Sequence, residues 1–200
     1  MTSIANMSSA NMSSAKLSEE EIENKIKKRE QRKQIESYKK KQTIFLMTSR
    51  FNNQTAEENK RFRDEGWPDG CLYCAPQKVS ENIPLHSKLL VLEMNNDTNT
   101  IMAVGLCVNK PLVERYSVYQ EANYNRFNYV GKYRIPREQL DTTEEAVFKA
   151  LDTLCFSGNE HMKRGNGIKQ FPAKILYNCL EVLDISAFIE NMFKTRFSKK

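Results

Sequence analysis

The clearest pattern of apolar and polar positions lies between Lys88 and Asn109. Two apolar runs, 89–94 and 100–108, flank a short polar connection made of Asn, Asp and Thr. This pattern is typical of a β-hairpin. Gly105 lies inside the second run, where a residue without Cβ usually marks a bulge or the close approach of another backbone or a ligand. We expect this hairpin to be the centre of a small β-structure.

The residues before the hairpin predict a long, exposed helix. Ser18 followed by Glu21 forms a capping box, and no Gly or Pro interrupts the next twenty or so residues. We therefore expect a helix over 19–41. Its few apolar residues form too thin a stripe for tight packing, which predicts a solvated, projecting helix. The segment before it repeats NMSSA at 6–10 and 11–15, and we expect 1–17 to be a disordered tail.

Shorter runs of the same kinds predict the remaining elements. A polar helix over 55–65 is expected to be capped by Thr55, with Glu58 three residues on. After the hairpin, a strand over 131–135 precedes a helical C-terminal third. The other predicted strands are 44–48 and 71–76, and the predicted C-terminal helices open at Asp141, at Pro172 and at Ser186.

Length and charge divide the chain into three parts. Its 200 residues suggest a tail over 1–17, a charged helix over 18–42 and one α+β domain over 43–200. A domain of that size can bury its own core, so disulfide or metal staples are not required. The net charge of +6 is concentrated in one segment, because 25–41 hold nine Lys or Arg against two Glu.

Three observations bear on the compartment. The five cysteines are an odd number without framework spacing, and no apolar run approaches the roughly 18 residues of a membrane span. The first residues also lack the features of a secretory signal. We expect an intracellular, reducing location, in a host cytoplasm or nucleus or in a virion, and no membrane partner.

The basic helix has several interpretations. It fits a charged, soluble lead into the domain, a nuclear-import signal or, less well, a coiled coil, since heptads are not sustained. It also fits an arm that contacts nucleic-acid phosphates with salt-sensitive, sequence-independent affinity. The arm residues expected to contact phosphates are Lys28, Arg29, Arg32, Lys33, Lys39, Lys40 and Lys41.

Signals for a metal site or for catalysis are thin. Cys71 and Cys74 form a CxxC motif without a second ligand pair, and as strand residues they point to opposite faces, so we expect no metal and no cofactor. No Ser/His/Asp order, zinc-protease helix or Walker A loop is present, and we assign no catalytic residue. The loop Gly165-Asn166-Gly167, with Lys163 and Arg164 before it, fits either a phosphate site or a plain helix-to-helix turn.

An aromatic and basic stretch over 115–134 gives the better clue to function. Tyrosines alternate there with Arg and Lys, a composition that suits stacking on single-stranded or flipped nucleotides, although several tyrosines must line the core. The candidate ligand-binding residues are Trp67, Tyr73, Tyr116, Tyr119, Arg126, Lys163 and Arg164.

The order of elements over Ile44 to Ile135 resembles the PUA-like superfamily, in particular its EVE, ASCH and YTH-type domains. The resemblance rests on IFLMTS, GWPDGCLY, NIPLHSK and the strand pair that ends in IMAVGLCVN. It implies a small, partly open, mixed β-barrel with flanking helices that binds RNA or a modified base. Trp67 and Tyr73 would be the aromatic cage residues. The long aromatic insert and the helical C-terminal third depart from the family pattern.

These observations leave three hypotheses. The first is a non-catalytic nucleic-acid-binding protein with an aromatic pocket and a basic arm. The second is a structural or scaffolding protein that binds a protein partner through its N-terminal helix. The Asn-, Lys- and Ile-rich composition suits an AT-rich genome such as that of a large DNA virus, so a virion component belongs to this second hypothesis. The third is an enzyme acting on nucleic acid or nucleotides at the glycine loop.

Overall fold

The computed structural model of the chain describes residues 18–66, 70–159 and 161–198. Within these residues the fold is α+β, with five α-helices, a mixed five-stranded sheet, a second sheet of two strands and no closed barrel. The expected tail over 1–17 and the candidate residue Trp67 lie outside the described residues.

The hairpin forms the middle of the larger sheet, as the apolar pattern predicted. Its strands are β3 (Lys88–Asn95) and β4 (Thr100–Val108), paired antiparallel. β1 (Ile44–Phe51) runs parallel to β3, with Ile44 opposite Lys88 and Phe51 opposite Asn95. β6 (Tyr133–Pro136) and β7 (Lys169–Gln170) close the two edges in the order β6-β4-β3-β1-β7. Because β1 and β3 are covered on both faces, their apolar residues are consecutive, over 44–47 and 89–92, rather than alternating.

The smaller sheet lies close against β4. It consists of β2 (Cys71–Ala75) and β5 (Phe127–Gly131), paired antiparallel. A Cβ on Gly105 would lie 2.0 Å from the Tyr73 hydroxyl oxygen and 2.7 Å from the Cys71 Cβ. The glycine in the hairpin therefore marks the close approach of side chains from the second sheet.

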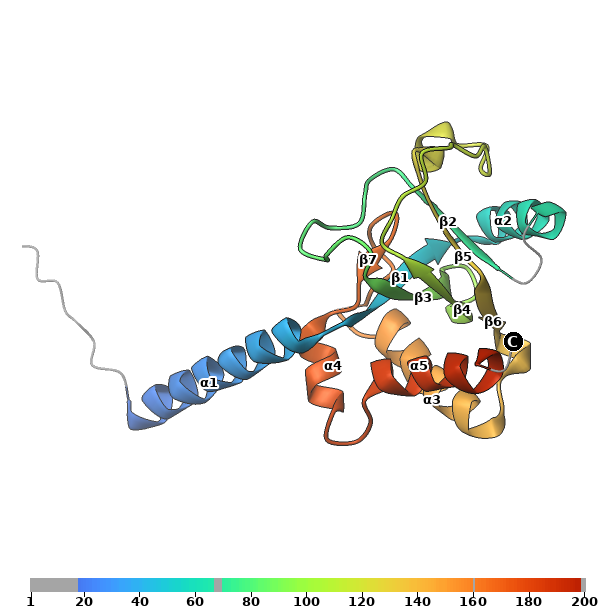
Figure 1. Ribbon diagram of the computed structural model, residues 1–200. Coiled ribbons are helices and arrows are strands. Elements are labelled where there is room, and N and C mark those ends of the chain that lie inside the picture. The colour runs from blue at the N-terminus through green and yellow to red at the C-terminus, as the bar shows by residue number, and fades with distance from the viewer. Residues whose placement is uncertain (1–17, 67–69, 160, 199–200) are drawn as a thin grey trace, which may run out of the picture.

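The C-terminal helices cover one face of the larger sheet, as Figure 1 shows. They are α3 (Thr142–Phe156), α4 (Ala173–Cys179) and α5 (Ile185–Phe197). Alternate residues of the central strands, such as Leu46, Leu90 and Leu92, meet Phe148 and Ile189 in this core. α4 follows Pro172 as predicted and ends at Cys179, so Leu180, which the apolar pattern places inward, is exposed beyond the helix end.

The opposite face of β1 and β3 packs against the smaller sheet. Phe45, Met47 and Val91 lie there with Leu72 and Tyr129 in a second core. α2 (Asn53–Gly66) and the 3-10 turn η1 (Ala122–Asn125) flank this core. The two cores share the central strands, so one sheet organises the whole domain.

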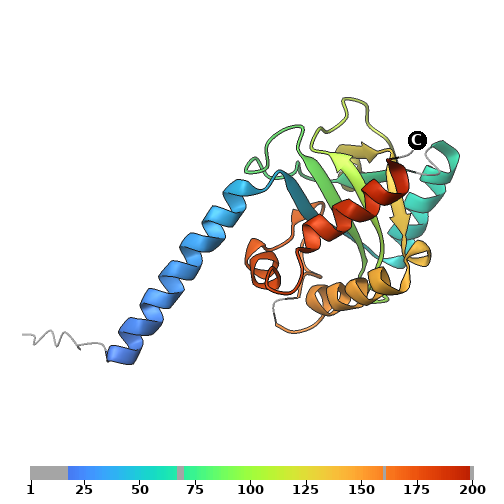
Figure 2. The ribbon, with the colours of Figure 1, turned by 60° about the horizontal axis from the view of Figure 1, so that its bottom comes forward.

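α1 (Glu19–Lys41) is the predicted basic helix, and Figure 2 shows it projecting from the domain. Its capping box joins Ser18 and Glu21 as expected. Only its C-terminal half is docked: Ile35 is buried, Gln34 accepts a hydrogen bond from the Tyr177 hydroxyl at 2.8 Å, and Tyr38 packs edge-on against Tyr177. The rest of the helix is exposed.

The cap of α2 differs from the prediction. The Asn52 side chain accepts a hydrogen bond from the Thr55 backbone N–H at 2.7 Å, and the Thr55 hydroxyl accepts one from the Asn52 N–H at 3.0 Å. This reciprocal pair begins the helix earlier than the expected Thr55 and Glu58 pair. The shift places Asn52 at the end of β1, where strand and helix meet.

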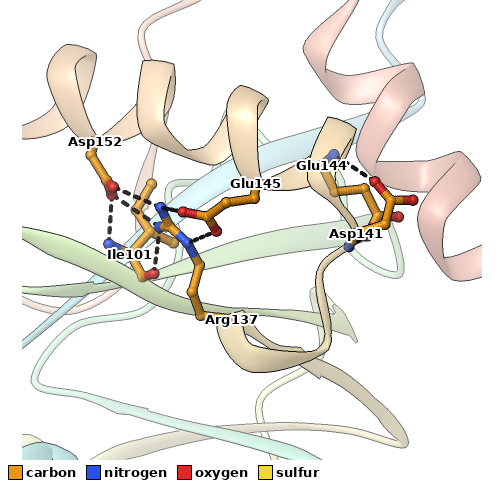
Figure 3. A network of polar contacts seen from close by, with 6 residues as sticks. All are labelled: Ile101, Arg137, Asp141, Glu144, Glu145 and Asp152. Carbon is orange, nitrogen blue, oxygen red and sulfur yellow. Dashed lines mark hydrogen bonds and ion pairs between the residues drawn. The ribbon is translucent and has the colours of Figure 1, made fainter.

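Figure 3 shows the polar network that fixes α3 on the edge of the sheet. Arg137, in the 3-10 turn η2 (Arg137–Gln139), binds Glu145 through Nε and Asp152 through Nη2 at 3.0 Å. Its Nη1 donates to the Ile101 carbonyl at 2.9 Å, and Asp152 accepts from the Ile101 N–H at 2.7 Å. α3 begins at Asp141 as predicted, and Asp141 and Glu144 form a capping box there.

Candidate functional site

The cationic residues expected to contact phosphates all lie exposed on α1. Among these seven residues one ion pair forms, between Lys39 and Glu36 at 2.6 Å, and an exposed pair of this kind contributes little to stability. The others have no carboxylate within ion-pair distance among the described residues. The arm thus offers a row of accessible positive charge.

A cleft of about 330 Å³ lies where β1 ends and α2 begins. The turn η1 and the glycine loop form the other walls. Three aromatic residues border the cleft: Phe51 and Tyr119 are buried, and Tyr124 is exposed. Its polar lining includes Arg50, Asn52, Gln54, Thr55, Glu58, Asn96 and Asn166.

Arg50 stands out in the wall of this cleft. Its Nε donates to the Met162 carbonyl at 2.5 Å, while its Nη1 is buried and has no hydrogen-bond partner. Burial lowers the pKa of the guanidinium, because it disfavours the charged form. No carboxylate lies within 4.0 Å of it among the described residues. Arg50 is therefore a partly desolvated cation without a counterion.

Asn96 supplies the complementary group. Its Nδ2 donates to the Lys163 carbonyl at 3.1 Å, and its Oδ1 is buried without a partner. Buried polar atoms are nearly always hydrogen-bonded, so each exception calls for an explanation such as a bound ligand. Two residues that line the cleft, Arg50 and Asn96, thus each hold a buried polar atom that has no hydrogen-bond partner among the described residues.

The glycine loop enters the cleft, but its two cations do not. Gly165 and Gly167 have positive φ values of 100° and 64°, which glycine adopts without strain, and both line the cleft. Lys163 instead donates through Nζ to Asn99 in the hairpin turn at 2.8 Å. Arg164 is exposed and lies outside the cleft lining. This placement weakens the hypothesis of catalysis by Lys163 and Arg164.

The structure separates the tyrosines that the sequence grouped together. Tyr73 is fully buried and donates to Glu93 at 3.0 Å, so its ring offers no face to a ligand. Tyr119 borders the cleft with one edge, and its hydroxyl accepts from Asn59 at 3.1 Å. Tyr116 packs on Phe62 away from the cleft lining. Arg126 is exposed outside it.

Sequence reasoning missed Arg50 and Asn96 as site residues, and it did not single out Tyr124. Arg50 had a signal, because it is the single charge in the otherwise apolar and hydroxyl-bearing run of β1. Asn96 looked like an ordinary turn residue. Its position beside Arg50 depends on the parallel pairing of β1 with β3, which no local pattern specifies.

The cysteines do not form a reactive or metal-binding group. Burial raises the pKa of the Cys71, Cys74 and Cys155 thiols to about 12, so they stay protonated at neutral pH. No group of three His, Cys, Asp or Glu suited to a metal ion occurs in the described part of the chain.

None of the described helices combines the length and the apolar character that crossing a membrane requires. No family model, curated protein or solved structure matches the chain.

Proposed function

We propose that this protein binds nucleic acid without catalysing a reaction. In this proposal the cleft holds a base of RNA, or a modified or flipped base, while α1 contacts phosphates. The observation that carries it is that Arg50 and Asn96, which both line the cleft, each hold a buried polar atom, a donor and an acceptor, without a hydrogen-bond partner among the described residues. Base edges present both acceptors and donors, so one donor beside one acceptor suits a base better than a purely anionic ligand.

The aromatic border supports the same proposal. Tyr124 presents an exposed ring beside the cleft, and stacking of a base on such a ring contributes about 1 to 3 kcal/mol. The cleft volume of about 330 Å³ falls at the small end of ligand pockets, which suits one base rather than a larger ligand.

The resemblance to PUA-like domains also supports the proposal of nucleic-acid binding, because that superfamily binds RNA or modified bases. We include in the proposal that the two sheets together correspond to the partly open barrel of that superfamily. The close approach of β2 to Gly105 of β4 and the central hairpin agree with such an arrangement. Trp67 keeps its proposed role as a cage residue by resemblance alone.

The arm and the cleft lie at opposite ends of β1. Lys41 precedes the strand and Arg50 lies near its end, and eight residues of strand span roughly 26 Å. A free nucleoside can therefore occupy only the cleft, whereas a longer strand can contact both. This separation lets one experiment test the two contacts independently.

The arm is tested by replacing Lys39, Lys40 and Lys41 with Gln in the full chain. Binding of single-stranded RNA, single-stranded DNA and duplex DNA is measured at several salt concentrations. We expect affinity to fall for all three, and the slope of log K against log salt to decrease by about 0.7 to 0.9 for each phosphate that the arm no longer neutralises. The matched control replaces the exposed Lys110, Lys149 and Lys174 and should leave the slope nearly unchanged.

The cleft is tested by Arg50→Gln and Asn96→Ala with free nucleosides and single-stranded RNA. Each change should weaken binding by roughly tenfold and reduce discrimination between bases, because it removes one hydrogen bond to the base. Trp67→Ala should reduce the same discrimination. Arg164→Gln, a charge change outside the cleft lining, is the control. Equal effects of arm and cleft variants on affinity and on discrimination would contradict the proposal that α1 contacts phosphates while the cleft recognises the base.

A protein-binding function is the second candidate, because Ile22 and Ile26 are 46% and 52% exposed on the projecting half of α1. Their spacing places them on one helix face. A scaffolding or virion protein of this kind should self-associate or require a partner, and it should bind nucleic acid weakly at physiological salt. Loss of association in an Ile22→Ser/Ile26→Ser variant, with unchanged RNA binding, would favour this candidate.

A further inference from the structure

A second cavity, of about 390 Å³, lies along α2. Phe51 borders both cavities, so the end of β1 lies between them. The charged residues that line the second cavity are Glu57, Lys60 and Arg63 from α2, Glu93 from β3 and Arg134 from β6. None of the cationic residues of the arm contributes to it.

Arg63 is the most unusual residue of this cavity. Its side chain is almost fully buried, at 6% exposure, yet no carboxylate lies within 4.0 Å of it in the described part of the chain. Its guanidinium is hydrogen-bonded to a neutral group, since Nε donates to Asn59 Oδ1 at 2.9 Å. Burying a charge without a counterion is costly, so such an arrangement needs a compensating anion.

Asn59 holds this guanidinium in place. The Asn59 amide nitrogen donates to the Leu72 carbonyl at 2.8 Å and to the Tyr119 hydroxyl at 3.1 Å. These two bonds fix the amide orientation, so its oxygen faces Arg63 Nε. Arg63 lines the cavity, and no hydrogen bond of its two terminal nitrogens occurs among the described residues. The donor group is preorganised rather than free to rotate.

The other charges of the cavity do not cancel Arg63. Arg134 binds both oxygens of Glu93, with Nη2 at 2.7 Å from Oε2, and Tyr73 donates to Glu93 as well. Glu93 is thus neutralised within the wall. Lys60 and Glu57 are both exposed at the rim, and Lys60 forms an ion pair with Asp64 at 3.9 Å. Among the described residues, Arg63 is left without a carboxylate within 4.0 Å.

We propose that the second cavity is a binding site for a phosphate group, with Arg63 as its main ligand and Lys60 at its rim. A guanidinium presents planar, paired donors that match the oxygens of phosphate. The site does not depend on the nucleobase cleft: the two share Phe51 but use different charged side chains, and either proposal can fail while the other stands.

The experiment measures thermal unfolding of the full chain against inorganic phosphate at constant ionic strength. A specific site gives a rise in Tm that follows a binding isotherm and saturates, whereas the general effect of phosphate on protein hydration grows steadily with concentration. The increment is compared with each variant's own Tm without phosphate, so a change in basal stability does not obscure it.

The variants are Arg63→Gln and Lys60→Gln, with Arg61→Gln as the matched control. Arg61 lies on the same helix, exposed and outside the cavity lining. We expect Arg63→Gln to weaken phosphate binding about tenfold or more and Lys60→Gln to weaken it less, because Lys60 is exposed to solvent. Arg61→Gln should keep the wild-type isotherm. If Arg63→Gln does not fold, Lys60→Gln and Arg63→Lys still test the site, since each should shift the isotherm.

Two further ligands identify the source of the phosphate group. If a nucleoside monophosphate or a short single strand displaces inorganic phosphate, the site takes phosphate carried by a nucleotide. If neither competes, it takes free phosphate. Both results support the site. A steady, unsaturating rise in Tm, or identical isotherms for wild type, Arg63→Gln and Lys60→Gln, would overturn it. Loss of nucleoside binding in Arg50→Gln with an intact phosphate isotherm would separate the two proposals.

Discussion

Arg134 and Arg63 show how the same residue type acquires different roles through its neighbours. Arg134 lies against Glu93, which is only 3% exposed, in a bidentate ion pair. Burial works to lower the pKa of the Arg134 guanidinium, but the charge of Glu93 and its hydrogen bonds outweigh burial and raise that pKa. Arg134 therefore has a partner within the fold, whereas Arg63 and Arg50 have no carboxylate within 4.0 Å among the described residues.

The Arg134 pair gives a prediction about stability. Arg134→Met should lower the free energy of unfolding by about 3 to 5 kcal/mol, because it leaves Glu93 buried without a cation. Adding Glu93→Gln should recover part of that loss, since the buried charge is removed. Urea unfolding of both single variants and the double variant gives the coupling energy. Arg126→Met, an exposed change, is the control and should stay within about 0.5 kcal/mol. A loss for Arg134→Met no larger than the control would contradict the pair's role.

Gly105 gives a second prediction at the residue scale. Gly105→Ala places a Cβ 2.0 Å from the Tyr73 hydroxyl oxygen and 2.7 Å from the Cys71 Cβ, and it should destabilise the protein by about 1 to 3 kcal/mol. Tyr73→Phe in the same chain should relieve part of this cost, because the hydroxyl is the nearest group. Gly66→Ala, where nothing lies within 4 Å, serves as the control. Equal stability of the two alanine variants would show that the two sheets can move apart.

At the scale of elements, ion pairs hold the C-terminal helices to the sheet. Arg137 joins η2 to α3, and Arg196 of α5 binds Glu144 of α3. The hydrogen bond that Glu145 accepts from Arg137 lowers the pKa of the Glu145 carboxyl from its ordinary value of 4.5. A depressed carboxyl pKa contributes stability above the pKa of the unfolded chain, and that contribution disappears as pH falls through the folded pKa.

This arrangement predicts the acid response of α3. Between about pH 5 and pH 7 the Glu145 contribution should be constant, and below about pH 4.5 it should decline. Glu145→Gln should be less stable than wild type at neutral pH, and the difference should vanish at low pH. Thermal unfolding from about pH 7 to about pH 3 measures it, with the exposed Glu138→Gln as the control. A difference that stays constant over the whole acid range would show that the Glu145 charge does not contribute.

For the whole molecule, the C-terminal half of α1 packs against the domain and its N-terminal half does not. Its N-terminal part projects, while Ile35 and Tyr38 pack against α4 and the domain. A truncation that separates arm from domain should therefore begin at Gln31 rather than after Lys41.

Two truncations test this boundary. The chain 31–200 should unfold at the same denaturant concentration as the full chain, because residues 18–30 are exposed along their whole length. The chain 42–200 should be less stable by about 1.5 to 3 kcal/mol, since Ile35 no longer packs against the domain. RNA binding by 31–200 reports the cleft together with the last basic residues of α1. Equal stability of the two truncations would mean that α1 is not docked in solution.

Local sequence patterns predicted most of the elements and their order, but not β5 or β7. Capping boxes at Ser18 and Asp141, the apolar runs of the hairpin and the glycine within the second run act through neighbours along the chain, so local patterns predict them. The start of α2 was misplaced because Asn52 and Thr55 both suit an N-cap, and only the backbone geometry at the end of β1 distinguishes them.

Which polar residues have partners depends on the tertiary fold and not on local sequence patterns. Tyr73 and Tyr124 are the same residue type, yet one lies in the core and the other borders the cleft. Arg50 and Arg63 became candidates because no carboxylate lies within ion-pair distance of either among the described residues. Asn96 became one because its Oδ1 has no hydrogen-bond partner there. A missing counterion is a property of packing between distant strands and helices, and the free energy of a buried charge depends on that packing rather than on sequence neighbours.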